Sequence, residues 1–332
     1  MKKFLYIALA AAAITSCSQD ETLELNQEAI SFGEAIVNNA TRAAAKDNTY
    51  GSDKLIESFK VWGTVTGSGN NNGNTVQVFN GANVTDEGEN NTTIAYGKAW
   101  KCDVTQYWIY GATYNFAAVV DAEANDVTLT NSLPSSIAYT ASTQKDILYA
   151  EAKGISHDAD DTAEDKLVKF DFSHLLSKVK FAAKNTTTDT QYTYNIKNLT
   201  ITNSVESGSV AVPAKTWTPN TNSSTYEGTD FGGIDGVTYK TDNTVYECAT
   251  EMLLIPANFE TTKLNISFDL EWCYKGSVIT STPKTLKASI NLVSGNAYKF
   301  TISTGLNAPI EFTVNTLTDW VDANPQPDDL EF

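Results

Sequence analysis

The stretch LNISFDLEW at residues 264–272 carries an apolar side chain at every second position. Alternation with a period of two is typical of a β-strand that buries one face and exposes the other. Shorter runs of the same kind recur along the chain, at residues 59–61, 76–78, 179–181, 199–201, 290–292, 300–302 and 310–314. The pattern predicts a protein built from strands.

Clusters of Gly, Asn, Ser and Asp separate these strands, as at residues 67–74 and 218–236. Frequent turns between short strands, without amphipathic helices, favour an all-β fold of antiparallel β-sandwiches over a doubly wound α/β sheet. The chain of 332 residues is long enough for two domains. We expect an N-terminal β-sandwich domain over residues 43–165 and a C-terminal one over 166–332, divided at the acidic stretch 151–166.

The N-terminal residues have the features of a secretory signal peptide. Lys2 and Lys3 precede an apolar run over residues 4–14, which is too short to span a bilayer. The run leads into ITSC, which looks like a bacterial lipobox that ends at Cys17. We expect residues 1–17 to be a lipoprotein signal peptide and Cys17 to carry the lipid, palmitate included. The alternative is an ordinary signal peptide with an incidental cysteine.

Charge and cysteine content narrow the class of protein further. The formal net charge of −17 argues against a nucleic-acid partner, because phosphates would not be neutralised. Beyond Cys17 the chain holds Cys102, Cys248 and Cys273, an odd number spread widely along the sequence. This spacing is not a disulfide framework, and we expect free, partly buried cysteines.

Candidate catalytic groups are sparse. The two histidines are His157 and His174, and the sequence contains no catalytic-serine elbow, phosphate-binding loop or paired-cysteine metal spacing. Asp269 and Glu271 could serve a glycosidase, yet they alternate outward from an apolar strand. Residues 158–161 could hold calcium, but they lack the glycine and final glutamate of a calcium loop, which favours a solvated linker. The sequence therefore predicts no enzyme, no cofactor and no metal site.

Several separated segments have the character of family motifs: ISFG at 30–33 with ATRA at 40–43, FSHLLSKVKF at 172–181, MLLIP at 252–256, NAY at 296–298, and residues 310–320. Together they resemble the fimbrillin family, the pilins of Bacteroidales-type bacteria. The segments follow one another in the family's order, and SQDE at 18–21 resembles an export tag for the outer face of the outer membrane. The resemblance implies two transthyretin-like β-sandwiches, a structural role for His174 at the start of a strand, and no catalytic residue.

The resemblance also implies a route to the cell surface. Residues 18–42 would form a propeptide strand, and an arginine-specific protease would cleave between Arg42 and Ala43. The precursor would be anchored in the outer membrane by its lipid. The cleaved chain would then assemble with other fimbrial subunits, as a homo- or hetero-polymer, into a fimbria for adhesion to a glycan or protein of a host or bacterial surface.

The sequence of this propeptide segment fits a strand that can be displaced from its domain. Ile30, Phe32, Ala35 and Val37 form two alternating pairs that are offset at Gly33, where a bulge would restore register. If this strand left the domain, a groove would open for a donor strand from another subunit.

Two questions stay open from the sequence. Trp217 and Tyr226 could form a sugar-stacking surface, so the alternative function is an anchored surface glycan-binding lipoprotein, which would not need cleavage at Arg42. The tail after Trp320 contains two prolines and is a poor central strand, so the position in the fimbria, stalk or tip, is undecided.

Overall fold

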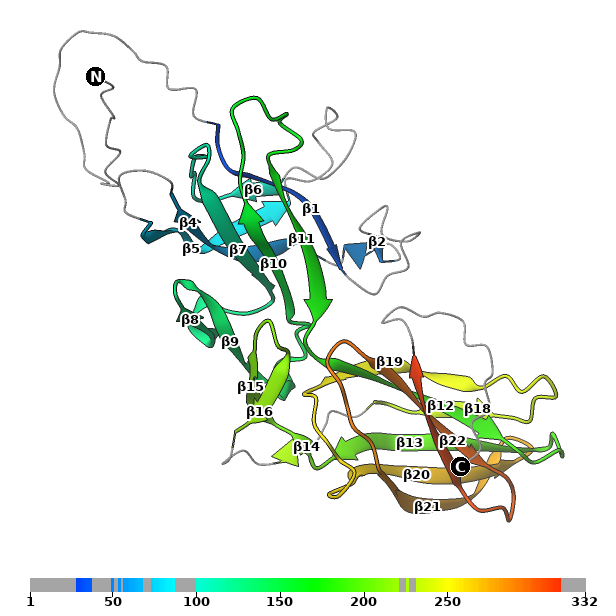
Figure 1. Cartoon of the computed structure of the whole chain (residues 1–332). Coiled ribbons are helices and arrows are strands. Elements are labelled where there is room, and N and C mark those ends of the chain that lie inside the picture. Colours follow the sequence, from blue (N-terminus) through cyan, green and yellow to red (C-terminus); the bar gives the residue numbers. More distant parts are fainter. Residues whose placement is uncertain are drawn as a thin grey trace, which may run out of the picture.

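The computed structural model describes residues 28–37, 49–50, 53–54, 56–67, 73–86, 100–220, 225–226 and 231–317. Within these residues the regular elements are strands and two short 3-10 helices, η1 (Ala124–Asp126) and η2 (Ala141–Thr143). The all-β class is therefore confirmed. The strands form two bodies that lie end to end (Figure 1). No helix in the described part of the chain is long and apolar enough to cross a membrane.

The first body is a closed barrel. Its hydrogen-bonded order is β1-β11-β10-β7-β4-β5-β6, and β6 pairs back to β1. The strands are β1 (Ser31–Val37), β4 (Ser58–Thr66), β5 (Thr75–Asp86), β6 (Trp100–Cys102), β7 (Thr113–Val120), β10 (Leu148–Ile155) and β11 (Leu167–His174). A cluster of apolar side chains fills the barrel, with Phe32, Phe59, Phe79, Phe116, Phe170 and Phe172 among its members.

The second body is a sandwich of two four-stranded sheets. One sheet has the order β19-β12-β22-β23 and the other β18-β13-β20-β21. The strands are β12 (Ser177–Asn185), β13 (Tyr192–Thr202), β18 (Ile234–Val237), β19 (Tyr246–Leu254), β20 (Leu264–Tyr274), β21 (Ser277–Ala288), β22 (Ala297–Thr304) and β23 (Glu311–Leu317). β20 contains the stretch at 264–272, and its apolar positions from Leu264 to Leu270 are buried as the alternation predicts.

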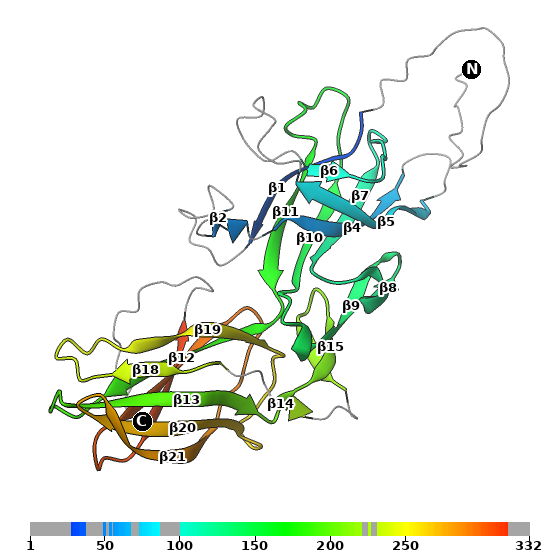
Figure 2. The same cartoon turned by 180° about the vertical axis from the view of Figure 1, so that it is seen from behind.

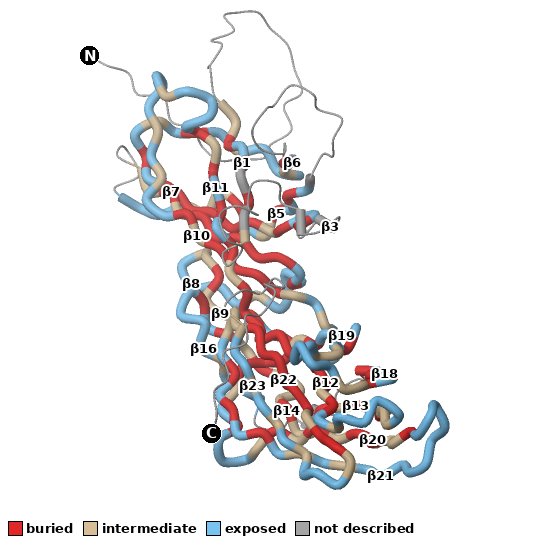
Figure 3. Tube along the Cα trace, turned by 90° about the vertical axis from the view of Figure 1, so that its right-hand side faces the viewer, coloured by how far each residue is buried: buried red, intermediate tan, exposed pale blue. Residues whose placement is uncertain are grey.

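A small sheet lies beside the place where the two bodies meet (Figure 2). It has the order β16-β15-β9-β8, from β8 (Val127–Thr130), β9 (Leu133–Thr140), β15 (Ser207–Ala211) and β16 (Thr216–Pro219). Two further short pairs are β2 (Thr49–Tyr50) with β3 (Asp53–Lys54), and β14 (Ser204–Val205) with β17 (Thr225–Tyr226). Buried segments continue from one body to the other (Figure 3).

The described strands divide differently from the sequence-based domains. β11 follows the predicted boundary at residue 166, yet it pairs with β1 and β10 inside the barrel. Residues 156–166 therefore connect two strands of one body, and the chain crosses to the sandwich at Leu175 and Leu176, which are both buried. β9 and β15 add a contact between the two halves, because Thr140 pairs with Ser207.

Two further local differences stand out. Not every pair is antiparallel, since β1 runs parallel to β11 and β12 runs parallel to β22. Residues 290–292 form no named strand, because Asn291 makes a single bridge to Asn258 after β21 has ended. Ile290 and Leu292 are nevertheless buried, so their alternation reflects burial without a regular strand.

Candidate functional site

The candidate site is strand β1 together with the part of the barrel that receives it. β1 pairs in parallel with β11, with Ser31 opposite Leu167 and Val37 opposite Phe172. On its other side Phe32 pairs with Trp100 of β6. β1 thereby joins β11 to β6 and closes the barrel (Figure 1).

The residues before β1 are held by main-chain hydrogen bonds to the loop after β6. The amide of Ile30 donates to the carbonyl of Gln106 at 2.8 Å, and the amide of Trp108 donates to the carbonyl of Glu28 at 3.0 Å. Ala29 also forms a bridge to Tyr107. The described segment is thus fixed along its length by backbone pairing that any strand sequence can provide.

Side chains of β1, and of Ile30 just before it, supply the apolar part of the fit. Ile30, Phe32 and Ala35 are buried, and Val37 is half-buried against the barrel core. The Phe32 ring lies within an aromatic cluster, with centroid separations of 6.0 Å to Phe59, 5.8 Å to Phe79, 6.4 Å to Phe116 and 6.0 Å to Phe170. Phe32 is therefore the central side chain of this contact.

A bulge allows both pairs of apolar residues to face the core. The register with β11 shifts between Phe32 and Ala35, as the offset at Gly33 predicts. A Cβ atom on Gly33 would lie 2.9 Å from the Cβ of Leu167. A larger residue at this position would force β1 or Leu167 to shift.

An ion pair joins the start of this segment to the barrel. Lys166 Nζ donates to Glu28 Oε2 at 2.7 Å, and the lysine side chain is almost fully enclosed while the glutamate remains partly exposed. Lys166 also lies over the ring of Tyr110, at 5.2 Å from its centroid. The hydrogen bond with Glu28 is the main cause that raises the pKa of Lys166 above its ordinary value.

The predicted processing and lipidation residues lie beyond the ends of this strand. Cys17, Arg42 and Ala43 fall outside the described residues, and β1 ends at Val37. Lipidation and cleavage therefore stay predictions. The four residues of the predicted displaced strand, by contrast, all belong to one segment that contacts the barrel.

The histidines occupy structural positions. His174 ends β11 and does not begin a strand, which corrects the expected place of this residue. It is buried, and its Nδ1 lies 2.8 Å from Asp146 Oδ2. His157 Nδ1 lies 3.1 Å from Asp161 Oδ2, and its ring packs edge to face on Trp108.

The candidate carboxylates Asp269 and Glu271 are held by hydrogen bonds to asparagines. Asp269 accepts a hydrogen bond from Asn198 at 2.7 Å, and Glu271 accepts one from Asn195 at 3.4 Å, so both are engaged on the sandwich surface. At residues 158–161 the carboxylate of Asp161 accepts from the Asp158 amide at 3.0 Å. Among the described residues, no group of three or more metal-ligating side chains is present.

The three cysteines and Trp217 have contacts typical of structural residues. Cys102, Cys248 and Cys273 are free, and the latter two are buried. Trp217 donates its indole N–H to the carbonyl of Leu175 at 2.8 Å, and its ring packs against Tyr139. This tryptophan connects the small sheet to the junction of the two bodies, which favours the structural interpretation over a sugar-stacking surface.

Sequence reasoning missed two parts of the site. It did not identify β11 as the partner of β1, because parallel pairing between residues so far apart leaves no local signal. It also missed the pair between Glu28 and Lys166, although a basic residue at the end of an acidic stretch was visible. Both features come from residues that are distant in sequence.

Comparison with known proteins identifies a family and two solved structures of similar fold. A family model described as fimbrillin-like matches residues 41–320. A fimbrial protein from Bacteroides vulgatus ATCC 8482 has a TM-score of 0.56 at 15% identity, over 87% of this chain and 99% of that chain. A candidate cell adhesion protein from Bacteroides ovatus ATCC 8483 has a TM-score of 0.54 at 18% identity, over 90% and 99%. At such identities these two likenesses show a shared fold alone. No curated protein sequence matches the chain.

Proposed function

Because this chain belongs to the fimbrillin-like family, we propose that it is a pilin subunit which is stored as a lipoprotein and activated by loss of β1. The family consists of fimbrial structural subunits, a non-enzymatic class found at the cell surface. In the proposal, Cys17 carries the lipid of the outer-membrane precursor, and cleavage after Arg42 releases the subunit. In the proposal, the barrel and the sandwich serve as the two domains of the subunit.

One observation carries this proposal: β1 closes the barrel through contacts that another strand can replace. Without β1, β11 would have one unpaired edge and β6 another, and the space of Phe32 would be empty. An extended strand from a second subunit would restore main-chain hydrogen bonds and refill the apolar groove. This is donor-strand exchange between subunits.

The free energy of burying apolar side chains favours replacement of β1 by another strand over a groove that stays open. Burial of an Ile or Phe side chain is worth about 1.5–3 kcal/mol, and Ile30 and Phe32, which cleavage at Arg42 would both remove, are buried. The net stability of a typical domain is only about 5–15 kcal/mol. Loss of β1 therefore removes a large share of the barrel's stability, and a replacement strand binds with a strong driving force.

The position of Arg42 couples release to activation. Cys17 and β1 both lie on the N-terminal side of this residue, so one cut separates the lipid and the strand from the rest of the chain. The segment around Arg42 is rich in small and polar residues, which suits access by a protease. A permanently anchored binder would not need such a cut.

Replacement of the arginine tests the proposal. Arg42→Ala would be expressed in the native host, with Lys46→Ala as a control that removes a neighbouring positive charge. Surface material from each strain would be separated by electrophoresis without heating. We expect Lys46→Ala to give the polymer ladders of the wild type and Arg42→Ala to give monomeric lipoprotein. Equal ladders from both variants would reject the mechanism.

A further inference from the structure

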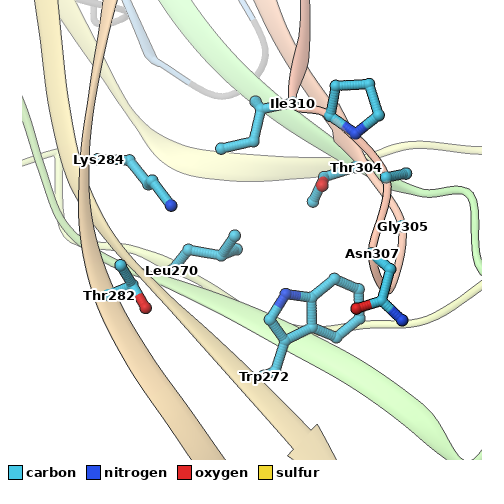
Figure 4. A pocket seen from close by; sticks show the side chains of 10 residues that line it. Leu270, Trp272, Thr282, Lys284, Thr304, Gly305, Asn307 and Ile310 are labelled. Atoms are coloured by element: carbon cyan, nitrogen blue, oxygen red, sulfur yellow. The ribbon is translucent and has the colours of Figure 1, made fainter.

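The sandwich has a pocket that is separate from β1. It lies at the open seam between the two sheets, where β20 and β21 face the turn that joins β22 to β23 (Figure 4). Its volume is about 360 Å³. Small-molecule sites occupy ~300–1,000 Å³, so the space admits a ligand of about one sugar ring.

The pocket has an apolar floor with one aromatic side chain. Leu270 and Ile310 contribute aliphatic surface, and Trp272 contributes its indole (Figure 4). The Trp272 ring packs on Tyr194 at a centroid distance of 5.4 Å, which fixes its orientation. Tyr194 is itself fully buried, so the aromatic surface rests on the sandwich core.

Two of the polar groups around the floor can only donate a hydrogen bond, the ammonium of Lys284 and the indole N–H of Trp272. Lys284 reaches toward the pocket from β21, and Asn307 lies on the opposite side (Figure 4). Within the described residues, no hydrogen bond or ion pair joins Lys284, Asn307 or the indole N–H of Trp272 to the protein. Unengaged donors around an apolar floor favour a ligand that is rich in acceptors.

The charge of Lys284 narrows the ligand class. The whole chain has a formal net charge of −17, which repels anions in general. Lys284 is the one charged residue among those that line the pocket, and it can form a charge-assisted hydrogen bond to a carboxylate. We propose that this pocket binds a pyranose ring that carries a carboxylate, as in a uronic or sialic acid.

The indole distinguishes a sugar from a simple carboxylate. A pyranose presents an apolar C–H face that packs on an aromatic ring, while its hydroxyls meet the surrounding donors. An acidic peptide side chain or terminus would use Lys284 and leave Trp272 largely uncovered. The combination of Trp272 and Lys284 therefore favours the acidic sugar.

This inference extends the proposed function, because it gives the adhesive subunit a ligand, and it rests on that function for its biological setting. The pocket residues share no pairing with β1. Binding can thus be measured on the unassembled chain, so a failure to bind sugar and a failure to polymerise are separate results.

The test uses the full chain beyond Cys17, labelled with nitrogen-15, and follows the indole N–H resonances during titration. The chain has six tryptophans, and Trp272→Phe identifies the signal of Trp272 by its loss. The probes are sodium glucuronate, glucose and sodium acetate. We expect a saturable shift of the Trp272 signal with glucuronate, affinity about tenfold weaker with glucose, and no saturable shift with acetate.

Two variants on one strand complete the test. Lys284→Gln removes the pocket cation, whereas Lys287→Gln removes an exposed charge of β21 that does not line the pocket. We expect about tenfold weaker glucuronate binding for Lys284→Gln and unchanged binding for Lys287→Gln. No saturable shift with glucuronate, or equal binding by both variants, would overturn the proposal. Acetate binding as tight as glucuronate binding would overturn the sugar class and indicate a general carboxylate site.

Discussion

The ring of Phe32 stacks on the ring of Phe170, with centroids 6.0 Å apart and planes 17° from parallel. Phe32 lies in β1 and Phe170 in β11, the strand that pairs with β1 in parallel. The contact joins the segment before Arg42 to a strand that stays in the barrel after the proposed cleavage. It therefore contributes to how firmly the uncleaved chain holds β1.

Phe32→Ala tests this contact. Truncation of a buried phenylalanine costs about 3–5 kcal/mol, and Phe32 contacts four other aromatic rings. We expect the uncleaved variant to lose stability of this order and amide hydrogen exchange in β11 to become faster. Ser31→Ala, at an exposed position of β1, serves as the control. Unchanged exchange in β11 of the Phe32 variant would show that β1 does not support the barrel.

Gly33→Ala tests the bulge. The new Cβ would lie 2.9 Å from the Cβ of Leu167, so the strands must separate locally. Overpacking of this kind costs about 1–3 kcal/mol. Gly67→Ala is the matched control, because no atom lies within 4 Å of a Cβ at that position. The two variants would be compared by denaturant unfolding, and equal midpoints would contradict a close approach at Gly33.

The ion pair between Glu28 and Lys166 predicts that the stability of the fold changes with pH in the alkaline range. The hydrogen bond to Glu28 raises the pKa of Lys166 above its ordinary value of 10.5. A raised lysine pKa stabilises the fold below the unfolded pKa, and the contribution is lost as pH rises through the folded pKa. We expect the stability difference between wild type and Glu28→Gln to be constant at neutral pH and to shrink above pH 10.5.

Urea unfolding at a series of pH values measures this difference. Glu164→Gln is a suitable control, because its side chain is exposed in the same β10–β11 connection. A difference between wild type and Glu28→Gln that stays unchanged through the alkaline range would show that the ion pair does not stabilise the uncleaved chain.

In the sandwich, the contacts of Glu251 predict that the stability of the fold changes with pH in the acidic range. Burial raises its pKa, but hydrogen bonds from Lys180 and Lys178 outweigh that effect and leave the pKa below its ordinary value of 4.5. A lowered carboxyl pKa stabilises the fold above the unfolded pKa, and the contribution is lost as pH falls through the folded pKa. We expect Glu251→Gln to be less stable than wild type at neutral pH.

The same difference should shrink as the pH falls below 4.5. Hydrogen exchange in β12 and β19 reports on this region, because both strands carry residues of the cluster. Glu311→Gln, at an exposed position of β23, is the control. An acid response of Glu251→Gln equal to that of the wild type would contradict the role of this carboxylate.

Local pattern predicted the parts of the fold that depend on neighbouring residues. The alternation at 264–272 predicted the buried face of β20, and the offset at Gly33 predicted the bulge of β1. In both cases the period of two is a property of the strand itself. Burial then follows from which side chains are apolar.

Features that join distant segments were beyond this kind of reasoning. The acidic stretch 151–166 has the composition of a linker, but β11 returns to the barrel because its apolar face packs on β1 and β10. The pocket is formed by Leu270, Lys284 and Asn307, which lie on two strands and a turn. Only the folded sandwich brings these residues together.

In the proposed mechanism, β1 leaves the subunit through cleavage after Arg42. The most direct measurement is the N-terminal residue of the protein in fimbriae sheared from cells of the native host. We predict that the assembled chain begins at Ala43 and lacks Ile30 and Phe32. Assembled protein that still begins at the lipidated Cys17 and retains β1 would contradict the claim.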